Sequence, residues 1–293
     1  MTWIEVSISV SREATPRAEL ALEHLGALAV TLEDVADSPV LEPDPGTTPL
    51  WPNVHVRGLF ESNINRQHVM AGLQAVPGVE RAGHIRWREV GDQDWSRAWM
   101  DRFQPMKFGD HLWIVPTGME IPADPSNIEI SLDPGLAFGT GTHPTTALCL
   151  EWLDRQDVAG KRIVDYGCGS GILGIAAALK GAGEVICVDN DPQALEATAA
   201  NAKRNGVGSI IKYLLPPAFA GPAADAVLAN ILAAPLISLA PVLAASVKSG
   251  CSIVLSGLFV EQHEEVAPAY RASCTETDSK TMDGWVRLVL QKR

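Results

Sequence analysis

The sequence contains few cysteines and few basic residues, and both shortages exclude classes of protein. Among its 293 residues are five cysteines, no two of which form a Cys-x-x-Cys pair. A disulfide framework or a zinc knuckle is therefore not expected, and a reducing compartment, the cytoplasm, is the expected location. Lysine and arginine total 23 against 35 acidic residues, which gives a net charge of −12. This balance argues against direct nucleic-acid binding, which needs a basic face.

The sequence also has no apolar leader and only one long uncharged run. Glu5, Arg12 and Glu13 interrupt the N-terminal segment, so no signal peptide is expected. Residues 226–247 carry no charge over 22 positions. This run includes Asn230 and two prolines, which indicate the end of a strand followed by a helix rather than a membrane span. We therefore expect no membrane association.

The first part of the chain alternates strand-like and helix-like patterns. The predicted segments are residues 3–9, 15–25, 29–35, 53–61, 64–76 and 84–90. Their order is strand, helix, strand, strand, helix, strand, which predicts an α+β, ferredoxin-like domain over residues 1–91. Residues 92–103 have helical spacing, with Trp95 and Trp99 four positions apart, and they are predicted to form a linker helix between two domains.

The remaining residues, 104–293, predict a second and larger domain. From residue 161 onward, apolar strands alternate with helices, which is typical of parallel βαβ units; they include a predicted helix over residues 235–247 and a predicted strand over residues 252–256. The last two predicted strands, residues 274–281 and 285–291, follow each other without a helix, so we expect an antiparallel hairpin there. The pattern thus predicts an α/β domain with a doubly wound, mostly parallel sheet.

The strongest local signal is the glycine-rich segment VDYGCGSG at residues 164–171. It follows a predicted strand and begins a helix. Its glycines allow the backbone to approach a ligand closely, and the helix N-terminus offers free N–H groups. The next strand ends at Asp189, 22 residues after Gly167. Because a carboxylate at that place can accept both hydroxyls of a ribose, the two features together predict a nucleoside cofactor.

Two cofactor classes share this arrangement. The dinucleotide fingerprint has its third glycine at the position occupied here by Ile172. The third glycine here is Gly171, and Asp165 precedes the turn, where an acidic residue suits a cationic ligand better than a pyrophosphate. This D-x-G-x-G-x-G pattern resembles the first motif of class I S-adenosylmethionine methyltransferases. An NAD-type oxidoreductase, a non-catalytic cofactor-binding module and a turn without any ligand remain alternatives.

A second signal is Asn230-Ile231-Leu232, which follows a later strand. It is expected at the carboxyl edge of the sheet, where ligands bind in open α/β folds. Amino methyltransferases that act on bases use a related Asn-Pro-Pro-aromatic sequence, in which the aromatic residue stacks on the base. Neither the prolines nor the aromatic residue follows Asn230, which favours an aliphatic amine as the acceptor. The alternative is that Asn230 caps the next helix.

A third signal is the loop LDPGLAFGTGTHPTT at residues 132–146. Its glycines and hydroxyl groups suit a loop that folds over a ligand. Thr146 lies in the first turn of the following predicted helix, where its hydroxyl could reach a cofactor carboxylate. His143 invites a metal or general-base interpretation. No second histidine or cysteine pair supports a metal site, so we expect His143 to pack within the loop.

These three segments together resemble the ribosomal large-subunit protein eleven methyltransferases, the PrmA family. The resemblance spans nearly the whole chain, and the long loop is its most specific part. The segments that match are residues 94–100, 103–114, 132–146 and 164–173, together with Asp189 and Asn230-Ile231-Leu232. Residues 208–222 contain no recognisable motif.

The resemblance implies a class I methyltransferase domain with a seven-stranded sheet and S-adenosyl-L-methionine as its cofactor. It implies that Thr146, Gly167, Asp189 and Asn230 contact the cofactor and that no metal is used. It further implies methyl transfer to lysine side chains and the N-terminal α-amine of ribosomal large-subunit protein eleven, which the N-terminal domain would recognise. Because no dedicated general base is evident, Asn230 is also the expected catalytic residue, aiming the amine lone pair through a hydrogen bond.

Overall fold

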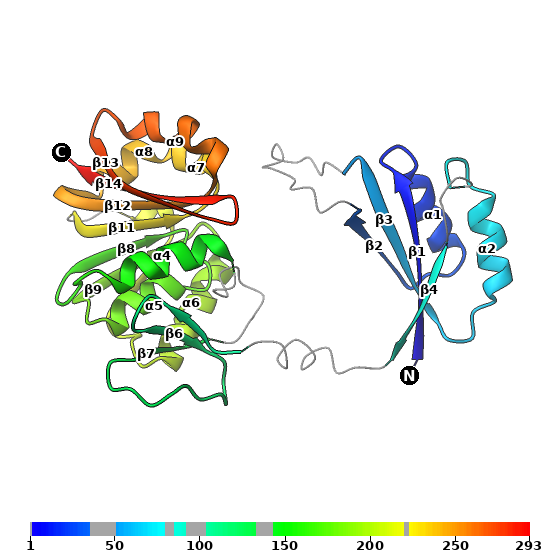
Figure 1. The fold of residues 1–293 in the computed structure, drawn as a ribbon, viewed down its shortest axis with the longest axis horizontal. Coiled ribbons are helices and arrows are strands. Elements are labelled where there is room, and N and C mark those ends of the chain that lie inside the picture. Colours follow the sequence, from blue (N-terminus) through cyan, green and yellow to red (C-terminus); the bar gives the residue numbers. More distant parts are fainter. Residues whose placement is uncertain (1, 36–50, 80–84, 92–103, 133–142, 220–222) are drawn as a thin grey trace. The chain divides into compact units, whose positions relative to one another are not determined.

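The computed structural model describes residues 2–35, 51–79, 85–91, 104–132, 143–219 and 223–293. The predicted linker helix over residues 92–103 and most of the predicted glycine-rich loop lie outside these residues. The chain divides into two compact units, Met1–Ala98 and Trp99–Arg293, which are drawn in Figure 1. Each unit is described by itself below.

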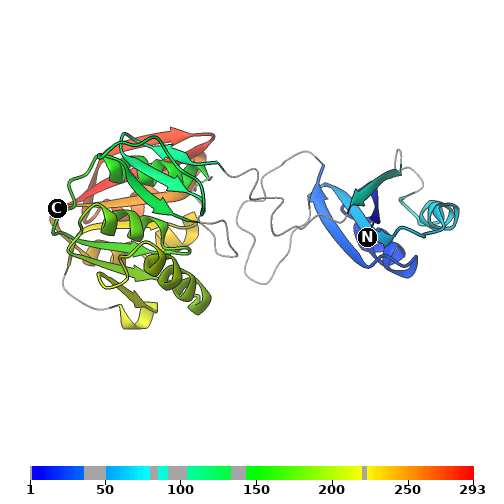
Figure 2. The same ribbon diagram turned by 90° about the horizontal axis from the view of Figure 1, so that it is seen from below.

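The first unit is a four-stranded antiparallel sheet with two helices. Its elements are β1 (Thr2–Ser11), α1 (Thr15–His24), β2 (Ala29–Asp34), β3 (Asn53–Glu61), α2 (Arg66–Gln74) and β4 (Arg86–Gly91). They follow the predicted order and pair in the sequence β2-β3-β1-β4. Alternate residues of β1, such as Val6 and Ile8, are buried with Leu22 of α1 and Leu73 of α2 in one core. Period-two burial of this kind places both helices on the same face of the sheet (Figure 2).

The second unit contains two sheets. Its strands are β5 (Met106–Phe108), β6 (Leu112–Val115), β7 (Ile128–Ser131), β8 (Arg162–Tyr166), β9 (Glu184–Val188), β10 (Ile211–Leu214), β11 (Ala224–Asn230), β12 (Val247–Phe259), β13 (Cys274–Met282) and β14 (Trp285–Lys292). Its α-helices are α4 (Pro144–Asp154), α5 (Ile172–Leu179), α6 (Pro192–Arg204), α7 (Ala233–Ser238), α8 (Ala240–Ala245) and α9 (His263–Tyr270). Short 3-10 helices precede β11 and α9, at Pro216–Ala218 and Val260–Gln262.

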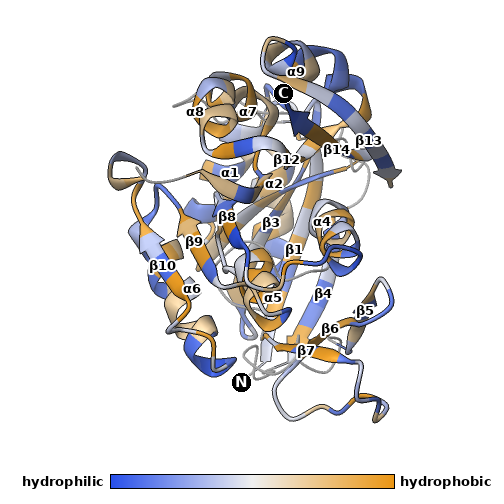
Figure 3. Ribbon diagram, turned by 90° about the vertical axis from the view of Figure 1, so that its left-hand side faces the viewer, coloured by the Kyte–Doolittle hydropathy of each residue, from blue (hydrophilic) through white to orange (hydrophobic). Residues whose placement is uncertain are grey.

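The large sheet confirms the prediction of a seven-stranded, mostly parallel sheet. Its strand order is β10-β9-β8-β11-β12-β14-β13, and β14 alone runs opposite to the other six strands. Ile163 of β8 belongs to a core shared with α4 and α5, whereas Val164 belongs to a core shared with α7, α8 and α9. Helices therefore cover both faces (Figure 1). Strands buried in this way are hydrophobic along most of their length, as β9 is after Glu184 (Figure 3).

Two predictions in the second unit are wrong in detail. The helix predicted over residues 235–247 is two helices, α7 and α8, that meet at Leu239. Pro241 lies at the start of α8, where its missing N–H is tolerated, whereas within one continuous helix it would remove a hydrogen bond. The strand predicted over residues 252–256 extends over all of β12, with a register shift between Leu255 and Leu258.

The uncharged run at residues 226–247 forms most of β11 followed by α7 and α8, as predicted for a strand and a helical segment. Within the described residues, no helix has the length and apolar character needed to cross a bilayer.

Candidate functional site

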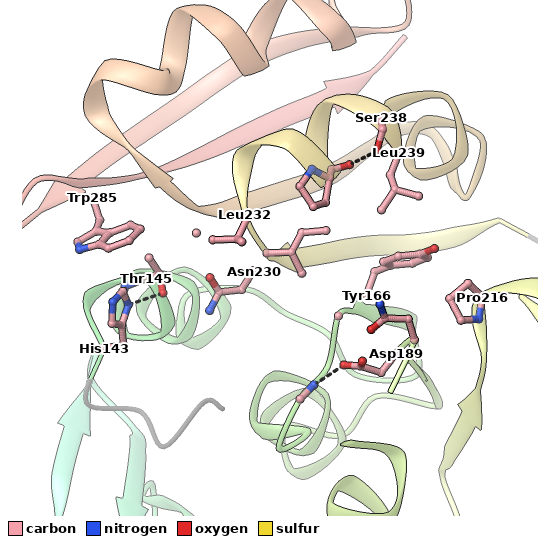
Figure 4. A pocket seen from close by; sticks show the side chains of 16 residues that line it. His143, Thr145, Tyr166, Asp189, Pro216, Asn230, Leu232, Ser238, Leu239 and Trp285 are labelled. Carbon is pink, nitrogen blue, oxygen red and sulfur yellow. Dashed lines mark hydrogen bonds between the residues drawn. The ribbon is translucent and has the colours of Figure 1, made fainter. Parts of the chain in front are cut away.

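A cavity of about 820 Å³ lies at the carboxyl ends of β8, β9 and β11 (Figure 4). Small-molecule sites in open α/β folds occupy this edge of the sheet and have volumes of this order. The residues that line the cavity are His143, Thr145, Tyr166, Gly167, Gly169, Asp189, Asn190, Pro216, Asn230, Ile231, Leu232, Pro235, Ser238, Leu239, Gly257 and Trp285.

The glycine-rich turn follows β8 and needs its glycines. Gly167, Gly169 and Gly171 have φ values of +76°, +54° and +79°, in the left-handed region that side chains disfavour. The N–H groups of Gly167 and Cys168 both donate to the carbonyl of Val188, which fixes the turn against the end of β9. Bare backbone at Gly167 and Gly169 therefore lines the cavity, as the sequence predicts for a cofactor-binding turn.

Asp189 lies at the end of β9 and lines the same cavity. Its Oδ2 accepts a hydrogen bond from Gly169 N–H at 2.9 Å, and its Oδ1 accepts one from Asp191 N–H at 3.0 Å. These two bonds fix the orientation of the carboxylate, and each oxygen keeps a further lone pair for a ligand hydroxyl. The structure thus places Asp189 beside the glycine turn, in a position suited to hold a ribose.

Asp165 lies in β8 and does not contact the cavity. Its side chain is 1% exposed, and its Oδ2 accepts a hydrogen bond from Gly174 N–H of α5 at 2.8 Å. Burial raises the pKa of this carboxyl group to about 7. The interpretation of Asp165 as a direct partner for a cationic ligand is therefore wrong. Its carboxyl group instead ties the first turns of α5 to β8.

Asn230 ends β11, and its side chain reaches α4. Its Nδ2 donates to Thr146 Oγ1 at 3.3 Å. Thr146 is fully buried behind Asn230, and the neighbouring Thr145 lines the cavity. The capping alternative for Asn230 is wrong, because α7 begins after Leu232 and no side chain caps it. A direct contact between Thr146 and a cofactor remains a prediction.

His143 precedes α4 and packs against neighbouring side chains. Its Nδ1 accepts a hydrogen bond from Thr145 N–H at 3.3 Å and pairs with Thr145 Oγ1 at 2.7 Å. Its ring meets Trp285 edge-on, with 4.7 Å between the ring centroids. Burial lowers the pKa of His143, which favours the neutral ring. In the described parts of the chain, no three histidines, cysteines or acidic residues are grouped to hold a metal ion.

Ile231 joins the two sides of the cavity, and two glycines make room for it. A Cβ at Gly167 would lie 2.1 Å from Ile231 Cγ2. A Cβ at Gly257 would lie 2.3 Å from the carbonyl oxygen of Ile231, and Gly257 has a φ of +90°. Gly257 lies in the irregular part of β12, whose Ser256 carbonyl accepts from Ile231 N–H. Sequence reasoning missed Gly257, although a Ser-Gly pair at a strand end is a known signal for a bulge.

Trp285 is the second residue that sequence reasoning missed. It begins β14 and is paired with Phe259 of β12. The two rings are stacked with 3.9 Å between their centroids and 26° between their planes. Figure 4 shows Trp285 on the far side of Asn230 from Asp189. No motif surrounds it in the sequence, so only the fold brings it to the cavity.

The cavity has a polar side and an apolar side, and Asn230 lies between them (Figure 4). Gly167, Gly169, Asp189 and Asn190 form the polar side, which suits a nucleoside. The apolar side consists of Leu232 and Trp285, whereas Leu239 lies on the same side of Asn230 as Tyr166 and Asp189 in Figure 4. Among the described lining residues, Asp189 has the only carboxylate, and none is a cysteine or a lysine. Such a site is suited to binding and aligning two reactants rather than to covalent or metal catalysis.

Comparison with known proteins gives a consistent result. The family model for ribosomal protein L11 methyltransferase (PrmA) matches residues 2–293. A protein named ribosomal protein L11 methyltransferase from Marinobacter nauticus is 50% identical, covering 100% of this chain and 99% of its own length. One from Pseudomonas paraeruginosa is 48% identical, with the same coverage of both chains. The crystal structure of a ribosomal protein L11 methylase from Lactobacillus delbrueckii subsp. bulgaricus is 30% identical, with a TM-score of 0.60. That match covers 65% of this chain and 100% of the crystallised chain.

Proposed function

Because the chain belongs to the ribosomal protein L11 methyltransferase (PrmA) family, we propose that it transfers methyl groups from S-adenosyl-L-methionine to amino groups of ribosomal protein L11. The acceptors are lysine side chains and the N-terminal α-amine. The observation that carries this proposal is the single cavity that brings Asp189 and the glycine turn to one side and Asn230 to the centre. The family match gives no support to an NAD-type oxidoreductase or a non-catalytic module.

The polar side of the cavity fits the cofactor. The carboxylate of Asp189 would accept the ribose hydroxyls, and the bare backbone of Gly167 and Gly169 would leave space beside them. At the other end of the cofactor, next to Asn230, the hydroxyl of Thr146 would contact the cofactor carboxylate. The sulfonium group of the cofactor supplies an activated methyl group, so the protein has to contribute mainly alignment.

The acceptor amine has to be neutral to attack. Deprotonating a lysine of pKa 10.4 at pH 7 costs about 4.6 kcal/mol, and an α-amine near 7.7–8.0 costs about 1–1.4 kcal/mol. Apolar surroundings lower both pKa values, and Leu232 provides an apolar surface on this side of the cavity. No described residue that lines this side has a carboxylate to act as a general base.

Asn230 is the residue proposed to aim the amine. Its Nδ2 is held by Thr146, which leaves its Oδ1 to accept a hydrogen bond from the amine N–H. Figure 4 shows this oxygen on the side of the residue that faces Trp285 and Leu232. An amine held by this hydrogen bond would direct its own lone pair toward the neighbouring side of the cavity, where the cofactor is proposed to bind.

We further propose that the domain over residues 1–91 recognises L11, that residues 92–103 link the domains, and that residues 104–293 form the methyltransferase domain. All described residues that line the cavity belong to the last segment, which has cores of its own. We expect a fragment of residues 92–293 to bind the cofactor with near-normal affinity and to lose methylation of L11. The cytoplasm is the proposed location, in keeping with five free cysteines.

The decisive experiment is incubation with isotope-labelled S-adenosyl-L-methionine and hypomethylated ribosomal proteins, followed by mass spectrometry. Label should appear on amines of L11, and the Asn230→Ala variant should lose most of it while still binding the cofactor. Cofactor binding without label on any ribosomal protein would refute the proposed transfer.

A further inference from the structure

We infer that Trp285 is the residue that positions the acceptor amine, by offering the face of its indole to the arriving ammonium group and its alkyl stem. This inference rests on the proposed function and deepens it, because it assigns the acceptor side of the same cavity. Trp285 acts through packing and through attraction of a cation to an aromatic face.

The indole is fixed in place by contacts on two sides. Phe259 stacks on it with 3.9 Å between ring centroids, and His143 meets it edge-on at 4.7 Å. Phe259 is itself held, because its N–H donates to Gln262 Oε1 at 2.9 Å. The carbonyl of Gly284, just before Trp285, accepts from Val260 N–H at 3.0 Å. A ring held in this way presents one fixed surface to the cavity and needs little ordering when a substrate binds.

The surroundings of Trp285 suit a cation on an alkyl chain. A lysine or α-amine arrives mainly as an ammonium ion, and no described lining residue on this side has a carboxylate to pair with it. Burial keeps His143 neutral, so it does not repel the cation. Leu232, which is 52% exposed, lies beside Trp285 in Figure 4 and offers an apolar surface for a lysine stem.

The two stacked rings, Phe259 and Trp285, differ in their contact with the cavity, so only Trp285 is placed to touch a substrate. Trp285 lines the cavity, whereas Phe259 does not. Trp113 of β6 provides a matched control, since it is also half-buried and has a lysine, Lys107, 5.6 Å from its ring centroid. Its Nε1 donates to Asn127 Oδ1, and it does not line the cavity.

The test compares the full-length protein with its Trp285→Leu, Trp285→Phe and Trp113→Leu variants. We measure kcat and KM for L11, the Kd of S-adenosyl-L-methionine by calorimetry, and binding of tetramethylammonium, a cation of the size of a fully methylated amine. Trp285→Leu should raise the KM for L11 at least about 10-fold and abolish tetramethylammonium binding, since a cation–aromatic contact is lost. The Kd of the cofactor should change less than about twofold. Trp285→Phe, which keeps an aromatic face, should fall in between, and Trp113→Leu should behave as wild type.

Three results would overturn the inference. They are an unchanged KM and unchanged tetramethylammonium binding in Trp285→Leu, an equal loss in Trp113→Leu, or a parallel loss of cofactor affinity. Failure of the proposed function looks different, because the wild-type protein would then label no ribosomal protein at all. Tetramethylammonium binding to the wild-type and Trp285→Leu proteins would still decide the role of Trp285 in that case.

Discussion

The two sides of the cavity differ in how far apart their residues lie in the sequence. The polar side, where we propose that the cofactor binds and which we call the cofactor side, is formed by Gly167, Gly169 and Asp189, which belong to one strand–turn–helix–strand unit. The acceptor side gathers residues between His143 and Trp285 from α4, β12 and β14 and from the segment after β11. Local chain geometry therefore builds the cofactor side, whereas the acceptor side depends on the whole sheet being assembled.

Ile231 is where the two sides meet. Its side chain would touch a Cβ at Gly167, and its backbone would touch a Cβ at Gly257. Because a packed interior has little room to relax, a change at either glycine has to move Ile231 and with it Asn230. Substitutions that push on Ile231 from each side therefore measure how tightly the two sides are coupled.

The largest effect is expected for Gly257→Val. The added Cβ would lie 2.3 Å from the Ile231 carbonyl oxygen, and valine is strained at a φ of +90°. Backbone cannot move aside as a side chain can, so we expect methyl transfer to fall more than about 100-fold and stability by about 3 kcal/mol or more.

Gly250→Val is the matched control for Gly257→Val. Gly250 lies in the same strand with a φ of +76°, but nothing lies within 4 Å of an added Cβ. This variant should lose only about 1–2 kcal/mol through backbone strain and should keep its activity. Kinetics and urea unfolding of both variants check the expectation. Equal losses of activity would mean that backbone strain alone, and not contact with Ile231, explains the effect.

Asp189→Ala should act on the cofactor side alone. Loss of hydrogen bonds to a charged acceptor costs about 1.5–3 kcal/mol, so the Kd of the cofactor should rise about 10- to 100-fold. Asp191→Ala is the control, because Asp191 caps α6 through Gln193 N–H without lining the cavity. Calorimetry should show near-normal cofactor affinity for that control. An unchanged affinity in Asp189→Ala would remove the ribose assignment.

The cofactor side could be predicted from the sequence because its determinants are contiguous. A strand, three glycines, a helix and an acidic residue after the next strand are typical of this fold and indicate the edge of the sheet where we propose that the cofactor binds. The mostly parallel sheet followed from the same regular alternation, and its seven strands from the resemblance to the methyltransferase family. The function of Asp165 was misjudged, because an acidic residue before a glycine turn has the same sequence pattern whether it faces the ligand or the core.

The acceptor side could not be predicted from local patterns. Trp285 and Phe259 become neighbours only through the pairing of β12 with β14, and sequence spacing does not show strand register. The Ser256-Gly257 pair is a local signal for a bulge, but the close contact that requires glycine at position 257 is with Ile231, which follows another strand. The break between α7 and α8 could have been predicted from the sequence, because Pro241 indicates the start of a helix.

Gly167→Ala is expected to have a smaller effect than Gly257→Val, and one that can be rescued. The added Cβ would meet the Cγ2 methyl group of Ile231, a side-chain atom, at 2.1 Å. Replacing Ile231 by alanine in the same chain removes that methyl group and should restore part of the lost activity. The residual loss reflects the positive φ of Gly167, a strain of about 1 kcal/mol. A double-mutant cycle measures the coupling, and purely additive losses would mean that the two residues do not interact.

The smallest effect on activity is expected at Asp165, which does not line the cavity, so its prediction concerns the pH dependence of stability. Burial raises the pKa of Asp165 to about 7, well above its value in an unfolded chain. Its contribution to stability is therefore fully present below about pH 4 and is lost as the pH rises to about 7. Asn at this position keeps an oxygen for Gly174 N–H but does not titrate. As the pH rises from 5 to 8, Asp165→Asn should gain about 2–3 kcal/mol of unfolding free energy relative to wild type, measured by urea unfolding. Parallel pH profiles for the two proteins would show that Asp165 has an ordinary pKa.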